Sequence, residues 1–241
     1  SMDAVDSVRL DTTEADEVER VLSAARPDLI INTVGLTNVD ECESNPALAQ
    51  GLNADSAEIV AKLAHRQKIS LVHISTDHLF DGVTSRKTES DITQPINNYA
   101  VTKRLGEIAV QNACPDSLII RTNFYGWGTA TRPSFTDWIL RGLEEKQQLT
   151  MFTDVFFTPI LINHLVESII DLVNSRASGV FNVVGSERLS KYAFALKTAD
   201  AFGYSVENIV PTKVTDFPFE APRPQDMSLS VVKIEKRLGK S

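Results

Sequence analysis

The chain has 241 residues, of which 42% are hydrophobic and 23% charged, so it is long enough to bury a sizeable core. Its formal net charge of −8 argues against a general nucleic-acid-binding surface, although it leaves room for a local anion site. No apolar run approaches the roughly 18 residues of a membrane span, and the first residues lack a secretory signal pattern. We therefore expect a cytoplasmic protein without membrane or nucleic-acid partners, in which Cys42 and Cys114 are buried or idle thiols.

Strand and helix patterns alternate along the first half of the chain. Val8–Leu10 is predicted to be a short strand, and Thr12 or Thr13 is the expected N-cap of the helix after it. That helix should cover about 15–25, and further helices are expected at about 46–66 and 98–112. Buried strands are predicted at 29–31, 69–74 and 118–120.

The second half has a more mixed pattern. Helices are expected at about 134–147, 161–174 and 190–202, and a strand at 180–184. Ser190 can cap the last of these helices, Gly203 can end it, and the segment 211–224 is predicted to be irregular. The overall alternation predicts an α/β fold with a doubly wound parallel sheet.

Chemistry is predicted where a buried strand ends and a helix begins. Tyr99 and Lys103 are four residues apart, which places both on one face of the helix that starts near residue 98. The preceding strand ends in Ser75-Thr76-Asp77, and ligands of open parallel sheets bind at such carboxyl ends. A strand-end hydroxyl that faces a tyrosine–lysine pair can polarise and protonate a carbonyl oxygen. The polar loop of about twenty residues in between is also typical of a functional segment.

Several spaced motifs carry a resemblance to a known family. They are Ile31 to Asp40, Glu43 to Pro46, Ser75 to Gly82, Tyr99 with Lys103 to Glu107, Arg121-Thr122 and Arg223-Pro224. With these motifs the chain resembles the dTDP-4-dehydrorhamnose reductase family of extended short-chain dehydrogenases, from about Asp11 to Leu238. The resemblance implies a Rossmann-like domain over 1–128, to which elements from about 155–185 return, and a mainly substrate-binding lobe over 129–241.

The same resemblance implies NADPH- or NADH-dependent reduction of a nucleotide-linked 4-keto-6-deoxy sugar. Its catalytic residues would be Thr76, Tyr99 as proton donor, and Lys103, which would lower the pKa of Tyr99. The implied cofactor-binding residues are Asp11, Thr12, Gly35, Leu36, Thr37, Ile74, Tyr99 and Lys103. The implied substrate-binding residues are Thr76, Asp77, Asn123 and Phe124. No metal site is expected, because Asp40, Glu41 and Glu43 do not form an octahedral set.

The chain departs from the family pattern in three places. The first glycine is Gly35, so the glycine-rich turn that binds pyrophosphate is missing from this sequence. This predicts an N-terminally incomplete sheet, weak cofactor binding and, through the open sheet edge, a homo-oligomer. Either the sequence is part of a longer reductase or it is a short relative. His78 occupies a position where family members usually have tyrosine, and Phe124 one where they often have tryptophan. These two substitutions put the rhamnose precursor in doubt as the substrate.

Two alternative functions remain open on sequence grounds. A sugar-nucleotide epimerase or dehydratase would share the fold, but dehydratases usually have Asp-Glu after the threonine, where this chain has Asp77-His78. A non-catalytic regulatory or binding subunit is favoured by the missing glycine-rich turn. The joint presence of Thr76, Tyr99 and Lys103 argues against it, because a binding subunit does not need all three.

Overall fold

The computed structural model describes residues 7–129 and 132–239, which are arranged around a parallel sheet. Four strands form this sheet in the order β1-β2-β3-β8, and every pairing is parallel. They are β1 (Leu29–Asn32), β2 (Ser70–Ile74), β3 (Leu118–Arg121) and β8 (Gly179–Asn182). The predicted α/β class with a parallel sheet is confirmed, and β8 joins the sheet from the second half of the chain, beside β3.

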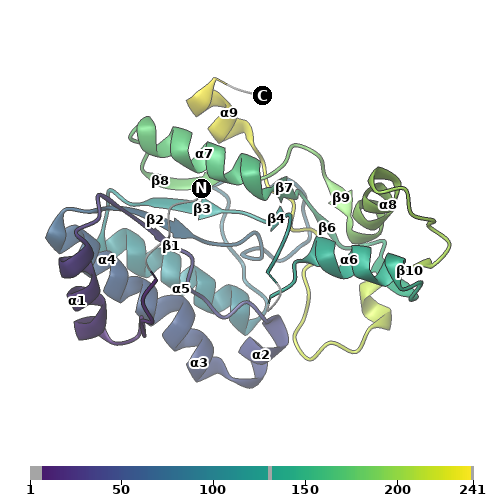
Figure 1. The fold of residues 1–241 in the computed structure, drawn as a ribbon, viewed down its shortest axis with the longest axis horizontal. Coiled ribbons are helices and arrows are strands. Elements are labelled where there is room, and N and C mark those ends of the chain that lie inside the picture. The colour runs from purple at the N-terminus through teal and green to yellow at the C-terminus, as the bar shows by residue number, and fades with distance from the viewer. Residues whose placement is uncertain (1–6, 130–131, 240–241) are drawn as a thin grey trace.

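Helices cover both faces of the sheet (Figure 1). One layer contains α1 (Ala15–Ala25), α4 (Ser56–Gln67) and α5 (Asn98–Ala113), and the other contains α7 (Ile162–Asn174) and α9 (Val232–Leu238). Apolar strand residues alternate between the two layers, so Ile119 packs towards α4 and α5 whereas Ile120 packs towards α7. Among the helices in the described part of the chain, none has the length and apolar character needed to cross a membrane.

Several elements from the second half of the chain form a lobe beside the sheet (Figure 1). Its helices are α6 (Phe135–Glu144) and α8 (Lys191–Ala201), which share a core with the parallel pair β5 (Leu149–Phe152) and β10 (Ile209–Thr212). The short strands β6 (Phe156–Phe157) and β9 (Leu189–Ser190) pair antiparallel, and β4 (Phe124–Tyr125) pairs with β7 (Ile160–Leu161). Ser190 caps α8 as predicted, because its hydroxyl accepts a hydrogen bond from Ala193 N at 3.0 Å.

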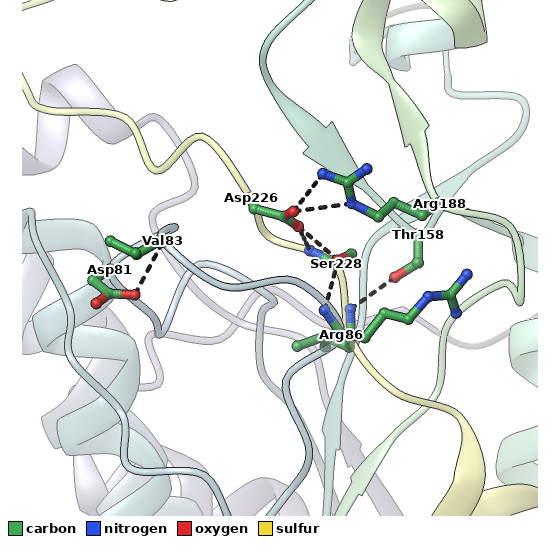
Figure 2. A network of polar contacts seen from close by, with 8 residues as sticks. Asp81, Val83, Arg86, Thr158, Arg188, Asp226 and Ser228 are labelled. Carbon is green, nitrogen blue, oxygen red and sulfur yellow. Dashed lines mark hydrogen bonds and ion pairs between the residues drawn. The ribbon is translucent and has the colours of Figure 1, made fainter.

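The C-terminal segment ties the lobe to the loop that follows β2 (Figure 2). Asp226 accepts hydrogen bonds from the Arg188 guanidinium at 2.6 Å and from the Ser228 hydroxyl at 2.6 Å. The Ser228 oxygen in turn accepts a bond from Arg86 N at 2.8 Å. Because Arg188 belongs to the lobe and Arg86 to the loop, this network fixes the two parts against each other.

Three local predictions are corrected by the structure. Val8–Leu10 is not a strand, since it pairs with no neighbouring strand in the described chain and its backbone is therefore left without ladder bonds. Neither Thr12 nor Thr13 caps α1, because Glu14 is the N-cap. Thr13 instead donates to the Asp11 carboxylate at 2.6 Å and closes a turn before the helix. Finally, Pro211 and Thr212, the first two residues of the segment expected to be irregular, belong to β10.

The long helix predicted at 46–66 consists of three consecutive segments. An α-helical turn, α3 (Pro46–Gln50), leads into a π-helical segment over Gly51–Asp55, and α4 continues from there. A further helix, α2 (Val39–Ser44), precedes them. The π-helical segment contains the fully buried Asn53, and such bulges are frequent at functional sites.

Candidate active site

The residues predicted to carry chemistry lie where β2 and β3 end and α5 begins. Thr76 and Asp77 directly follow β2, while Tyr99 and Lys103 are on the first turns of α5. All four side chains are buried. The position of α5 is set by its N-cap Asn97, whose side chain accepts a bond from Ala100 N at 2.8 Å and donates to Pro222 O at 2.9 Å.

Burial dominates the acidity of Tyr99. Desolvation raises the pKa of its phenol to about 12, and the neighbouring Asp77 carboxylate adds to this rise, while a hydrogen bond with Thr76 partly offsets it. The imidazole of His78 stands edge-on to the Tyr99 ring, with 5.4 Å between ring centroids. Tyr99 is therefore protonated at neutral pH, with a hydroxyl and an aromatic wall beside it, as a proton donor requires.

The pKa of Lys103 is lowered, whereas that of Tyr99 is raised. Burial lowers the pKa of its ammonium group to about 8, although Glu107 opposes the change. Its Nζ donates a hydrogen bond to Ile74 O at 2.8 Å, at the end of β2. The expected depression of the Tyr99 pKa by Lys103 is not seen, because desolvation outweighs other influences on the phenol.

Asp77 is a buried carboxylate held by polar neighbours. Desolvation raises its pKa to about 6, while the Lys191 charge and a 2.7 Å hydrogen bond from Asn123 Nδ2 act in the opposite direction. The His78 Nε2 atom lies 3.9 Å from Asp77 Oδ1, yet burial lowers the pKa of this imidazole to about 3. The His78 imidazole is thus uncharged at physiological pH and lines the site, and its low pKa makes it a poor base.

The segment after β1 approaches the same site closely. A Cβ atom at Gly35 would lie 2.9 Å from Asn53 Oδ1 and 3.8 Å from Lys103 Nζ, so a side chain there would enter the space beside the ammonium group. Asn53 holds Leu36 by two hydrogen bonds, accepting from its N at 2.7 Å and donating to its O at 3.2 Å. It also donates to Thr102 Oγ1 at 3.0 Å, which links this segment to α5.

Sequence reasoning missed Asn53. An asparagine inside a predicted helix gives no signal of its own, because the π-helical turn that points it inward is not visible from periodicity. Its chemistry could have been a clue, since a polar side chain among apolar helix positions needs buried partners.

Other predicted residues lie at the margin of this group. Phe124 is the first residue of β4, directly after Asn123, and is 52% exposed. Thr37 is exposed and its hydroxyl accepts a 2.9 Å bond from Arg132, which belongs to the segment before α6. Asp11 and Thr12 form part of the turn before α1, and within the described residues no hydrogen bond joins them to Gly35 or to α5.

A parallel sheet covered on both faces, with a threonine, a tyrosine and a lysine at a strand end, defines a Rossmann-like protein of the short-chain reductase class. The chain belongs to the family of the RmlD substrate binding domain, whose model matches residues 1–241. The family resemblance noted in the sequence is thereby confirmed.

Named relatives agree with this assignment. The chain is 31% identical over 235 residues to a probable low-salt glycan biosynthesis reductase, Agl14, of Haloferax volcanii, with 96% of this chain and 78% of the relative covered. It is 33% identical over 232 residues to dTDP-4-dehydrorhamnose reductase of Salmonella typhimurium, covering 91% of this chain and 76% of that protein.

Solved structures resemble the chain equally well. Bacillus anthracis dTDP-4-dehydrorhamnose reductase in complex with NADP matches with a TM-score of 0.89 and 27% identity, over 96% of this chain and 82% of that one. A hypothetical dTDP-4-dehydrorhamnose reductase from Sulfolobus tokodaii matches with a TM-score of 0.87 and 30% identity, over 100% and 85% of the two chains. The Rossmann-like fold is confirmed by these matches.

Proposed function

We propose that the protein reduces the 4-keto group of a nucleotide-linked 4-keto-6-deoxy sugar with NADPH or NADH, and that Tyr99 donates the proton. The observation that carries this proposal is the burial of Thr76, Tyr99 and Lys103 together at the end of β2. The names of the relatives support a dTDP-linked sugar as substrate, and the NADP in the Bacillus anthracis structure supports the cofactor.

The nicotinamide cofactor supplies a hydride to the keto carbon when it is bound. The residues of the chain then have to stabilise and protonate the oxygen, on which negative charge develops. In the proposal the Thr76 hydroxyl donates a hydrogen bond to that oxygen, and the Tyr99 phenol transfers its proton to it. The O–H bond of tyrosine breaks as that of the product alcohol forms. Solvent then reprotonates the phenolate, and Lys103 is proposed to bind the ribose of the cofactor.

The residues present fit the nicotinamide half of such a cofactor. Lys103 Nζ bonds to one backbone carbonyl, that of Ile74, and therefore has donors left for ribose hydroxyls. Because Gly35 has no side chain, its backbone packs closely against Asn53 beside this ammonium group, and Leu36 and Thr37 follow it in the chain. Asp11 and Thr12 are proposed for the adenine end, and Asp77, Asn123 and Phe124 for the sugar.

The alternative functions find less support. A dehydratase needs an acid after the aspartate, and a neutral His78 with a pKa of about 3 does not supply one at physiological pH. A non-catalytic subunit gives no reason to bury Tyr99 and Lys103 beside Thr76, since burying polar groups costs free energy.

We further propose that the protein forms a homodimer through α5 and acts in the cytoplasm, where its two free, buried cysteines stay reduced. Val101, Leu105 and Ile108 are exposed along one face of α5 at 37%, 40% and 38%, an apolar stripe of the kind that a symmetric partner covers. Light scattering should therefore give twice the monomer mass. Leu105→Glu should give the monomer mass, and a wild-type monomer would contradict the dimer.

Turnover tests the proposed function directly. At cofactor concentrations high enough to offset the weak binding expected from the missing glycine-rich turn, the purified protein should oxidise NADPH or NADH in the presence of a dTDP-4-keto-6-deoxyhexose. The loss of reduced nicotinamide should match the alcohol formed. Cofactor oxidation that is independent of the sugar, or none with any nucleotide-linked 4-keto sugar, would refute it.

A further inference from the structure

Lys191 is a cation that none of the predicted roles accounts for. It is the first residue of α8, directly after the N-cap Ser190, and its side chain is half-buried. The ammonium nitrogen lies 3.4 Å from the ring centroid of Phe157 and 5.0 Å from that of Phe135. In the described part of the chain no hydrogen bond or ion pair engages this nitrogen, whereas Lys197 on the same helix pairs with Glu187 at 2.9 Å.

Lys191 interacts electrostatically with Asp77. Each lowers the cost of the other's charge, because Lys191 depresses the pKa of the Asp77 carboxyl and Asp77 raises that of the lysine. Among the described residues no ion pair joins the two groups, so the Lys191 nitrogen is more than 4.0 Å from the Asp77 oxygens. Asp77 instead accepts a hydrogen bond from Asn123 Nδ2 at 2.7 Å.

A group that bridges the two has to suit both of them. A carboxylate accepts hydrogen bonds and an ammonium group donates them, so a group that both donates and accepts satisfies the pair. A hydroxyl does so. A phosphate does not, because it has no proton for Asp77 at neutral pH and its charge is repelled by the carboxylate.

We propose that Lys191 is a sugar-recognition residue of the site. Its ammonium group donates a hydrogen bond to a hydroxyl of the substrate sugar, and that hydroxyl donates its own proton to the Asp77 carboxylate. The sugar thereby binds between the end of β2, where Asp77 lies, and α8 of the lobe, which begins with Lys191. The inference rests on the proposed function and adds the residue that the lobe contributes.

The first test is binding by calorimetry with two probes, a dTDP-linked 6-deoxyhexose and dTDP alone. Lys191→Met preserves the packing on Phe157 but removes the charge. A hydrogen bond to a charged group is worth about 1.5–3 kcal/mol, so affinity for the dTDP-sugar should fall at least about tenfold, and affinity for dTDP should be unchanged. The matched control Lys197→Met should bind both like the wild type. An equal loss for both probes would assign Lys191 to the diphosphate and overturn the proposal, as would no loss at all.

Kinetics should show the same split. Lys191→Met should raise KM about tenfold and leave kcat within a few-fold, because the contact to the hydroxyl exists before and during hydride transfer. Lys191→Arg should restore part of the KM. An effect confined to kcat would contradict a binding role.

A third measurement needs no turnover. The groups around Asp77 are Lys191 on α8, Tyr99 on α5, and Asn123 and His78 on the adjoining loops. Removal of the lysine should raise the carboxyl pKa above its value of about 6, as read by carboxyl NMR, while Lys197→Met should not. An unchanged pKa overturns this inference alone, whereas absence of turnover by the wild type overturns the proposed function.

Discussion

Replacement of Tyr99 by phenylalanine removes the proposed proton donor and little else. The ring stays packed against His78, at 5.4 Å between centroids, so the shape of the site survives. General acid catalysis contributes roughly 10²–10⁴ in rate, which corresponds to about 3–5 kcal/mol of activation free energy. We expect Tyr99→Phe to lower kcat by this factor and to leave the dissociation constant for the nucleotide sugar almost unchanged.

The assay is steady-state reduction of a dTDP-4-keto-6-deoxyhexose, with calorimetry for substrate binding. Tyr204→Phe, which deletes the phenol oxygen of a partly buried tyrosine packed against the core of the lobe, is the control and should keep wild-type turnover. Thr76→Val should cost about 2–4 kcal/mol of the barrier, as for one lost oxyanion donor. Wild-type turnover by Tyr99→Phe would refute the reasoning, because the proton would then come from another group.

The remaining predictions concern charge and packing. Burial raises the pKa of Asp77 from 3.8 to about 6, so ionisation of this carboxyl destabilises the folded state above pH 6 and has no such effect below pH 3.8. Asp77→Asn should therefore raise the free energy of unfolding at pH 8 by up to about 3 kcal/mol, as measured by urea unfolding. The pKa of Lys103, lowered to about 8, predicts that kcat/KM falls above pH 8, and Lys103→Arg should abolish this alkaline decline if activity survives. Gly35→Ala should lower the free energy of unfolding by about 1–3 kcal/mol and weaken NADPH binding, since its Cβ would lie 2.9 Å from Asn53 Oδ1. Gly51→Ala, which has open space around its Cβ, should be neutral or slightly stabilising in the same urea unfolding experiments.

Periodicity predicted most of the sheet and its helices. The apolar runs that became β1, β2 and β3 are short, continuous and bounded by polar residues, which is typical of strands buried on both faces. The failures lie where tertiary contacts decide. Within the described part of the chain, the segment Val8–Leu10 has no neighbouring strand with which to pair. β10 contains Pro211, a residue typical of loops, which is accommodated because β5 is the one strand beside β10 among the described residues.

The candidate site was predicted in part for a similar reason. Spacing on one helix and the end of one strand were enough to bring Tyr99, Lys103 and Thr76 together. The positions of Asn53 and Lys191 depend on a π-helical turn and on the placement of a separate lobe. Neither of these follows from local sequence, and the pKa of Tyr99 also depends on burial that only the assembled fold provides.

Deuterium transfer tests the central claim most directly. The protein is incubated with NADPH deuterated at the transferable C4 position of the nicotinamide and with a dTDP-4-keto-6-deoxyhexose, and the product is examined by mass spectrometry and NMR. The proposed reaction predicts one deuterium on C4 of the product sugar and a hydroxyl at that carbon, with the label confined to one face. A product without deuterium at C4, or no product under conditions in which both the cofactor and the nucleotide sugar bind, would contradict it.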